Sequence, residues 1–316
     1  MASIRSGLSA ALAFCMWFGS ASAAWPERPV TLIVPFAAGA ATDVVARVLA
    51  ESLSERLGVN VVVTNRDGAS ATIGAAAIAQ ARPDGYTLGY SAIGPITIQP
   101  HLMAGLAFRP DSFEAICQTS ELPFALAVKA DAPWRTLGDV VAAAKAAPGR
   151  LRFGVTGTNT IPHLAVIELQ LAAGIELVHI PYRGETGIAT PLATGELELA
   201  VVTPGFGLRQ GMRQLASFTA ARVAETPDVP TAGEQGFKVV QTVPSGLLAP
   251  KGVEPAVLER LGRACAEAVK SERFQASLKG SAQPFAYADA AAFARAIAED
   301  FAAKGALIQR AGIKPQ

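Results

Sequence analysis

"VTLIVPFAAGAATDVVARVLAESLSERLGVNVVVT", residues 30–64, decides the fold of this chain. A β-rich apolar run, residues 30–34, leads through a loop of small residues into a segment whose apolar residues recur at helical spacing. Gly58 ends that segment, and residues 59–64 are again β-rich. The pattern predicts a strand, a helix and a second strand, which together form a βαβ unit.

The loop "PFAAGAATD", residues 35–43, contains no base, nucleophile or metal ligand that would suggest catalysis. A helix N-terminus presents unpaired N–H groups and a partial positive charge of about half a unit. Small side chains there let an anion approach, so we interpret the loop as a carboxylate cradle in which Thr42 caps the helix. Asp43 is interpreted as a first-turn carboxylate that favours the helix dipole. The alternative is a tight turn whose small side chains serve packing alone.

The same alternation of strands and helices continues along the chain and then starts again near residue 150. It favours parallel sheets covered by helices, an α/β architecture, with two domains suggested by the length. From Pro255 the pattern is mostly helical. Further strands are expected at residues 87–92, 113–118, 124–130, 151–155, 176–181 and 197–203, and further helices at residues 136–148, 161–173, 187–194, 255–274 and 289–312. Because no low-complexity linker occurs, we expect crossing strands to join the domains.

The first 23 residues have the pattern of a secretory signal peptide. Arg5 is basic, residues 8–18 are apolar, and small residues at 21–23 offer a cleavage site. The apolar run is much shorter than the roughly 20 residues that span a bilayer, so we expect an exported, periplasmic protein.

The charge balance argues against a nucleic-acid-binding protein, and the cysteine content argues against a disulfide-rich protein. Without Arg5 the mature chain has 27 − 1 = 26 basic and 26 acidic residues, so nothing suggests a nucleic-acid partner. Two cysteines, Cys117 and Cys265, remain in 316 − 23 = 293 residues, too few for a disulfide framework. Their spacing leaves open whether they are bonded.

The loops that follow the expected strands contain no enzyme signature. In open α/β sheets, ligands bind beyond the carboxyl ends of the strands. The loops there, residues 35–43, 91–95, 154–163 and 181–187, are rich in Gly, Ala, Ser and Thr. They lack the P-loop lysine, G-x-G-x-x-G and G-x-S-x-G, and the three histidines lack zinc-site spacing. We therefore expect no catalytic residue, metal or cofactor, and we interpret His163 as a hydrogen-bonding residue of a loop or helix start.

Several motifs, in order along the chain, resemble the receptors of tripartite tricarboxylate transporters, often called Bug receptors. They are residues 25–58, "VVVTNRDGAS" at 61–70, "PDGYTL" at 83–88, "HIPYRG" at 179–184, "TPDVPTAGEQGF" at 226–237, "GLLAPKGV" at 246–253 and "AGIKP" at 311–315. The resemblance implies a type II periplasmic-binding-protein (Venus flytrap) fold with two α/β domains, each a mainly parallel sheet flanked by helices. It places domain 1 at residues 24–126 plus 246–316 and domain 2 at 127–245, with the C-terminal helices returning to domain 1.

The resemblance also implies the function and the site. A small organic carboxylate would bind in the interdomain cleft through backbone groups and waters, and a monomeric receptor would deliver it to membrane transporter subunits. By position in the family pattern, the ligand-binding residues are Phe36, Ala38, Gly39, Thr42, Ser91, Ala92, Thr156, Gly157, Asn159, His163, Tyr182, Arg183, Gly184 and Thr203. Two alternatives stay open: an enzyme on the same scaffold, and a ligand sensor that reports to a membrane signalling protein. The sequence does not identify the acid.

Overall fold

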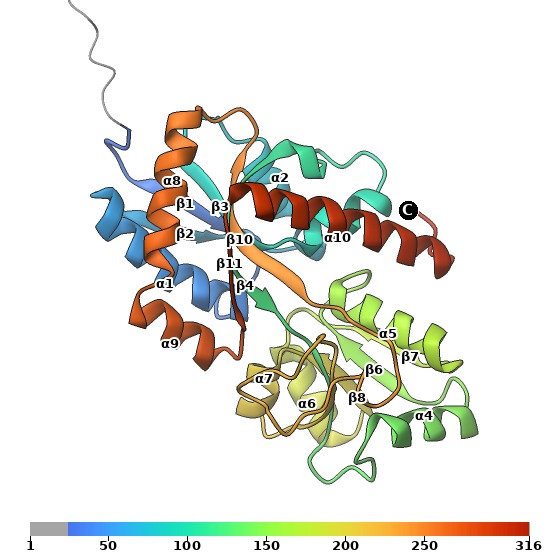
Figure 1. Ribbon diagram of the computed structural model, residues 1–316. Coiled ribbons are helices and arrows are strands. Elements are labelled where there is room, and N and C mark those ends of the chain that lie inside the picture. Colours follow the sequence, from blue (N-terminus) through green and yellow to red (C-terminus); the bar gives the residue numbers. More distant parts are fainter. Residues whose placement is uncertain (1–24, 316) are drawn as a thin grey trace, which may run out of the picture.

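The computed structural model describes residues 25–315, arranged as two lobes, each built around its own β-sheet (Figure 1). The signal peptide expected at residues 1–23 lies outside the described residues. The first lobe contains the six-stranded sheet and both ends of the described chain, and the second lobe contains the five-stranded sheet. The expected α/β architecture is confirmed.

The sheet of the first lobe has the strand order β11-β4-β10-β3-β1-β2. Its strands are β1 (Val30–Val34), β2 (Val61–Asn65), β3 (Thr87–Ala92), β4 (Phe113–Leu122), β10 (Val243–Pro250) and β11 (Phe285–Ala288). β1 pairs in parallel with β2 and β3, in a register that sets Val30 opposite Val61. β10 and β4 pair with their neighbours in antiparallel orientation.

The sheet of the second lobe has the order β7-β6-β8-β5-β9. Its strands are β5 (Ala125–Val128), β6 (Arg152–Val155), β7 (Val178–Pro181), β8 (Leu199–Val202) and β9 (Arg213–Ser217). β6 pairs in parallel with β7 and β8, whereas β5 pairs antiparallel with β8 and β9. Both sheets are therefore mixed, which corrects the expectation of mainly parallel sheets. In the first lobe the reason is that β4 leaves and β10 returns, so these two strands run in opposite directions.

Helices cover both sheets. They are α1 (Ala41–Leu57), α2 (Thr72–Ala79), α3 (Gly94–Ile98), α4 (Leu137–Ala146), α5 (Ile161–Ala173), α6 (Thr186–Thr194), α7 (Pro204–Arg209), α8 (Pro255–Ala268), α9 (Glu272–Gly280) and α10 (Ala290–Arg310), with three 3-10 turns, Ala69–Ala71, Gln99–His101 and Pro110–Ser112. α8 and α9 pack against α1, and α10 lies along β4 and α3. The C-terminal helices thus return to the first lobe, as expected. In residues 25–315 no helix is both long and apolar enough to cross a membrane.

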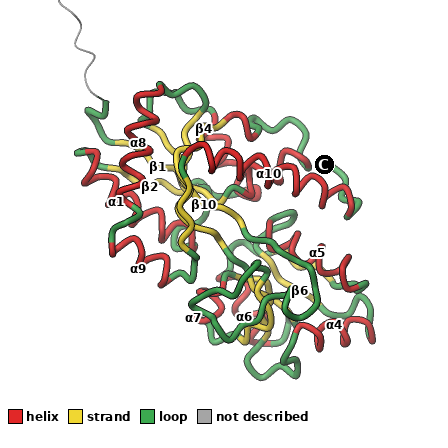
Figure 2. Tube along the Cα trace, in the orientation of Figure 1, coloured by secondary structure: helices red, strands yellow, loops and turns green. Residues whose placement is uncertain are grey.

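Two segments connect the lobes (Figure 2). One runs from β4 into β5, where Leu122 ends the first strand and Ala125 begins the next. The other returns from β9 to β10, and within it Gln241 N–H donates to Phe218 O at 2.8 Å. The expectation that strands rather than a flexible tether join the two halves is confirmed.

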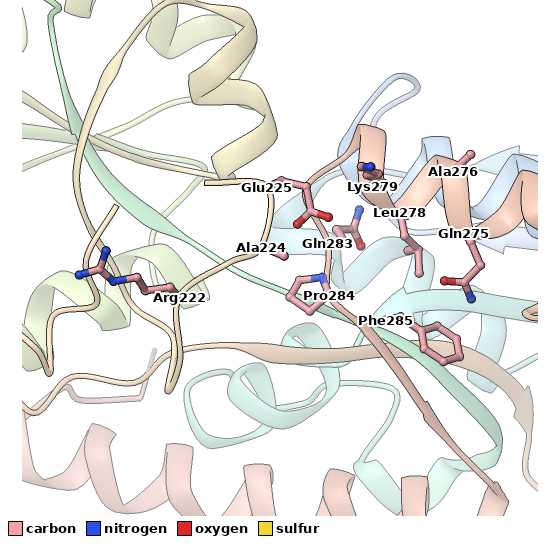
Figure 3. Close-up of a pocket in the computed structure, with 10 residues that line it drawn as sticks. All are labelled: Arg222, Ala224, Glu225, Gln275, Ala276, Leu278, Lys279, Gln283, Pro284 and Phe285. Atoms are coloured by element: carbon pink, nitrogen blue, oxygen red, sulfur yellow. The ribbon is translucent and has the colours of Figure 1, made fainter. Parts of the chain in front are cut away.

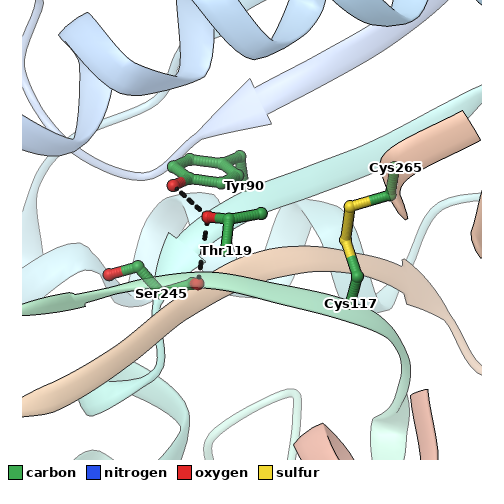
Figure 4. The surroundings of a disulfide bond; sticks show 5 residues. All are labelled: Tyr90, Cys117, Thr119, Ser245 and Cys265. Atoms are coloured by element: carbon green, nitrogen blue, oxygen red, sulfur yellow. Dashed lines mark hydrogen bonds between the residues drawn. A yellow bond between two sulfur atoms is a disulfide. The ribbon is translucent and has the colours of Figure 1, made fainter. Parts of the chain in front are cut away.

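A disulfide ties α8 to the sheet of the first lobe (Figure 4). Cys117 on β4 and Cys265 on α8 are both fully buried, and their Cα atoms lie 6.6 Å apart. Beside them the hydroxyls of Tyr90 and Thr119 lie 2.8 Å apart, and Thr119 Oγ1 donates to Ser245 O at 3.3 Å. These contacts fasten the three central strands β3, β4 and β10 to one another. The question that the sequence left open is settled: the two cysteines are bonded.

Candidate ligand-binding site

The predicted loops lie at the carboxyl ends of parallel strands, as the sequence indicated. Residues 35–40 follow β1 and residues 93 onward follow β3 in the first lobe. In the second lobe, residues 156–160 follow β6, residues 182–185 follow β7 and Thr203 follows β8. Because β6, β7 and β8 are parallel neighbours, their following loops share one edge of that sheet.

The loop before α1 is organised by the buried carboxylate of Asp43. One oxygen accepts from Gly39 N–H at 2.8 Å and from Arg47 Nε at 2.9 Å, and the other accepts from Asn65 Nδ2 at 2.8 Å. Burial alone would raise the pKa of Asp43, but the hydrogen bonds from Arg47, Gly39 and Asn65 lower it below the ordinary value. Asp43 does lie in the first helical turn, as predicted, and it also occupies the Gly39 N–H that could otherwise face an anion.

The prediction that Thr42 caps α1 is wrong. Ala40 is the N-cap residue, has no side-chain cap, and is followed by Thr42 as the second residue of the helix, where its side chain is buried. The first-turn amides cannot find partners within the helix. The amides at the start of α1 therefore have no partner within the helix, and the N–H of Gly39, just before it, is engaged by Asp43.

The remaining first-lobe candidates divide by exposure. Ala38 and Gly39 are exposed, and Phe36 is half-buried against the two largest apolar cores. Ser91 and Ala92, at the end of β3, are buried. The structure thus leaves Ala38 and Gly39 as the accessible part of this group.

The loop Thr156–Thr160 before α5 has an unusual backbone. Gly157 has φ +90° and Asn159 has φ +55°. Thr160 Oγ1 donates to Gly157 O at 3.0 Å, and Asn159 N–H donates to His163 Nδ1 at 2.9 Å. Three predicted residues, Gly157, Asn159 and His163, are therefore brought together. From the first turn of α5, His163 acts as the hydrogen-bonding residue that the sequence suggested.

His163 stacks against His179, with ring centroids 3.9 Å apart, and against Phe153, at 6.0 Å. Since Nδ1 accepts the Asn159 N–H, the neutral ring carries its proton on Nε2. Burial, and to a lesser extent the neighbouring His179, lowers the pKa of His163 to about 4. Burial also lowers the pKa of His179. Both rings are therefore neutral at pH 7, and His163 connects the stacked pair to the loop through its hydrogen bond with Asn159.

The loop after β7 contains three predicted residues. Tyr182 is half-buried against Gly154, where an added Cβ would lie 3.1 Å from the tyrosine ring. Arg183 is exposed, and Gly184 has φ +72°. Arg183 is thus free to reach solvent at the sheet edge that carries the other candidate loops.

Thr203 is held by Glu185, a residue that the sequence analysis did not select. Thr203 Oγ1 donates to Glu185 Oε2 at 2.9 Å, and Thr203 N–H donates to the other carboxylate oxygen. Burial raises the pKa of Glu185 to about 7, against the opposing effect of these hydrogen bonds. Both donors of Thr203 are engaged within the protein, so its predicted ligand contact would need them to be released.

Sequence reasoning missed Asn65, Ser70, Gln99 and Glu185. Asn65 directly follows an expected strand, and Glu185 lies in the candidate loop at residues 181–187; these positions were the available signal. Ser70 ends the motif at residues 61–70, but neither it nor Gln99 could be selected from local sequence, because both contact the second lobe: Ser70 Oγ donates to Thr158 O and Gln99 Nε2 donates to Asn159 O.

A separate groove lies between the lobes near α9 and β11 (Figure 3). It has a volume of about 510 Å³ and is lined by residues of both lobes, among them Arg222, Lys279 and Phe285. None of the predicted ligand-binding residues lines it. Among the described residues, no three His, Cys, Asp or Glu side chains gather as a metal site would require.

The arrangement of two mixed sheets, with small-residue loops at the strand ends, matches a known family. The profile of the tripartite tricarboxylate transporter family receptors matches residues 45–313. This chain belongs to that family. A UPF0065 protein of Cupriavidus necator is 34% identical over 293 residues, covering 92% of this chain and 89% of the relative. Protein BugT of Bordetella pertussis is 32% identical over 255 residues, covering 78% of each chain.

Solved structures agree with this assignment. The structure of the periplasmic binding protein BugD is 29% identical and superposes with a TM-score of 0.84 over 92% of this receptor and 100% of that chain. An R. palustris protein with adipate is 27% identical and gives a TM-score of 0.85 over 92% of this receptor and 100% of that chain. The receptor therefore has the two-domain periplasmic-binding-protein fold, and solute binding for a tripartite tricarboxylate transporter is its function.

Proposed function

We propose that this receptor captures a small organic carboxylate in the periplasm and delivers it to the membrane subunits of its transporter, without chemical conversion. One observation carries the proposal: the N-terminus of α1 is open. Ala38 and Gly39 are exposed, and a Cβ added to Gly39 would meet no atom within 4 Å. The helix end offers first-turn amides and a partial positive charge to an anion in that space.

The negative charge of Asp43 is compatible with an anion bound at the N-terminus of α1. Its carboxylate accepts three hydrogen bonds and pairs with Arg47, so its negative charge is largely compensated within the loop. The adipate bound to the R. palustris relative supports the choice of a carboxylate ligand. Among the polar candidates of the second lobe, Arg183 is exposed and Tyr182 is half-buried.

We also propose that the receptor is a monomer with two domains, and that the domains divide close to the expected boundaries. The expected divisions, after residues 126 and 245, each fall inside a strand, β5 and β10 respectively. Since β5 belongs to the second sheet and β10 to the first, we propose divisions at residues 123–124 and 241–242.

Ligand binding is expected to stabilise the mature receptor against heat. At a ligand concentration near 100 times the dissociation constant, the gain is about 2.7 kcal/mol, which gives a measurable shift in Tm. Adipate and other mono- and dicarboxylates form the panel for thermal-shift measurement, and mass spectrometry before and after incubation tests for conversion. No shift across the panel, from protein shown to be free of copurified ligand, would contradict carboxylate capture. A chemically altered ligand would favour the enzyme alternative.

Gly39→Val is expected to reduce affinity for the acid found in that panel. The valine side chain enters the open space before α1, and φ +80° at this position disfavours any residue with a Cβ. Losing a hydrogen bond to a charged group costs about 1.5–3 kcal/mol, which is about tenfold to over a hundredfold in Kd by calorimetry.

Gly58→Val is the matched control. Gly58 lies at the other end of the same helix, has φ +75°, and its added Cβ would also meet no atom within 4 Å. Both variants should lose similar stability, whereas Gly39→Val alone should lose affinity. Equal affinities in the two variants would show that the loop before α1 is only a turn.

A further inference from the structure

Two side chains of the first lobe donate hydrogen bonds to consecutive carbonyls of the second lobe. Ser70 Oγ donates to Thr158 O at 3.2 Å, and Gln99 Nε2 donates to Asn159 O at 2.9 Å. The two donors come from different elements, the turn Ala69–Ala71 and the turn Gln99–His101. Their acceptors belong to one loop, Thr156–Thr160, so both lobes determine how this loop is held.

The backbone around Ser70 is strained at the point where it contacts the second lobe. Gly68, Ala69, Ser70 and Ala71 have φ of 116°, 47°, 54° and 69°. Left-handed backbone is unfavourable at each residue with a Cβ, and it persists where surrounding structure fixes it. The second lobe lies directly against this turn, since a Cβ added to Gly157 would be 3.6 Å from Ser70 Oγ.

Gln99 makes its contact from a buried position. The residue is only 4% exposed, so a side-chain amide left without a partner there would lose its hydration without compensation. Close apolar contact between the lobes lies nearby, because a Cβ added to Gly94 would be 2.4 Å from Ile161 Cδ1. Gln99 is thus satisfied by Asn159 only when the lobes are together.

Within the loop, Asn159 is held from both sides. Its carbonyl accepts from Gln99 of the first lobe, and its N–H donates to His163 of its own lobe. With φ +55° the residue is in the left-handed region, which residues with a Cβ adopt only uncommonly. Separating the lobes would remove the restraint on the carbonyl side and allow the loop to relax.

We propose that Ser70 and Gln99 form a latch, which closes when the lobes meet and sets the conformation of the loop Thr156–Thr160. They are positioning residues: they stabilise the closed arrangement and the loop without needing to touch the ligand. The free energy of the latch adds to apparent ligand affinity, because it raises the population of the binding-competent state. The inference rests on the proposed function only in treating this loop as part of the ligand site.

Amide hydrogen exchange of the mature receptor without added ligand tests the latch. Gln99→Glu replaces the donating amide by a carboxylate that cannot donate to Asn159 O when ionised, and Ser70→Ala removes the hydroxyl. Each variant should accelerate exchange in peptides that cover residues 156–163 at least threefold, and the double variant at least tenfold. The affected segment lies in the other lobe, 60 residues from Gln99 in sequence, so local damage in the first lobe would not produce this pattern.

Two matched variants remove comparable donors away from the latch. Gln275 Nε2 donates to Val269 O at 2.7 Å, and Ser277 Oγ donates to Phe274 O at 2.8 Å, both at α9. Gln275→Glu and Ser277→Ala should leave exchange in residues 156–163 unchanged. If Gln99→Glu does not fold, Gln99→Met removes the same donor without adding charge.

Unchanged exchange in residues 156–163 in both Ser70→Ala and the folded Gln99 variant would overturn the latch. Because no ligand is present, this outcome is independent of carboxylate binding. Failure of the ligand panel with the exchange pattern as expected would instead contradict the proposed function and leave the latch supported.

Discussion

Lys304→Met is expected to lower the free energy of unfolding by about 3–5 kcal/mol, as removal of one partner from a buried ion pair typically does. Lys304 Nζ lies 3.1 Å from Asp300 Oδ1 and donates to Gln241 Oε1 at 2.7 Å, and its side chain is 5% exposed. Methionine fills similar volume but leaves the Asp300 carboxylate, 12% exposed, without its cation. Gln241 also donates to Glu168 Oε2 at 2.7 Å, so the change affects a chain of contacts from α10 to α5.

Urea unfolding of three variants measures this effect. Lys270→Met is the control, because it breaks an exposed ion pair with Glu267 at the C-terminal end of α8. It should change the free energy of unfolding by less than about 1 kcal/mol. Combining Lys304→Met with Asp300→Leu removes both charges and should recover part of the loss. If Lys304→Met is no more destabilising than Lys270→Met, the buried pair does not contribute to stability as proposed.

His163→Gln and Glu185→Gln are expected to change the pH dependence of stability in opposite directions. The folded pKa of His163 is about 4, below its ordinary 6.5, so the unfolded chain binds the proton first as pH falls. Stability from His163 is complete above pH 6.5 and decreases by up to about 3 kcal/mol toward pH 4. His179, stacked on the same ring, also has a lowered pKa and contributes in the same direction.

Glu185 has the opposite sign. Its folded pKa is about 7, above the ordinary 4.5, so the folded protein holds a proton that the unfolded chain has released. Stability from Glu185 is complete below pH 4.5 and decreases by up to about 3 kcal/mol as pH rises to 7. Arg209 is the nearby cation, and it moderates this effect. In the parent protein the two contributions largely cancel between pH 4.5 and 6.5.

Free energies of unfolding at half-unit steps from pH 4.5 to 7 reveal the two contributions. His163→Gln should become less stable than the parent as pH rises, because the Glu185 contribution is then opposed only by that of His179. Glu185→Gln should become less stable as pH falls. Glutamine keeps an acceptor for Asn159 N–H in the first variant and for Thr203 in the second. Parallel pH profiles for the two variants would contradict the assignment.

Local patterns predicted the elements that depend on nearby residues. The helix expected at residues 161–173 is found as α5 with the same bounds, and α1 ends at Gly58, which adopts the left-handed conformation that glycine permits. The antiparallel pairing of β4 with β10 was not predictable from local patterns, because the two strands are more than a hundred residues apart in the sequence. Antiparallel pairing between such distant strands leaves no periodic signal in the sequence.

The candidate loops were predictable, but their hydrogen-bond partners were not. Asp43 and Arg47 are four residues apart on a helix, a spacing that indicates an ion pair. Nothing in the sequence indicated that Asp43 would also engage Gly39, or that Glu185 would occupy both donors of Thr203. Such contacts depend on how loops fold back on themselves, which residue types and spacing do not determine.

The disulfide has a topological consequence for the whole receptor. Cys117 and Cys265 are 148 residues apart, and the five strands of the second sheet all lie between them. The second lobe is therefore part of a covalent ring closed inside the first lobe. A protease that cuts once in the exposed segment around Lys129 and Arg135 opens this ring without dividing the molecule. Under oxidising conditions the nicked chain would still be one covalent species, and both halves of the ligand site would stay attached to the same core.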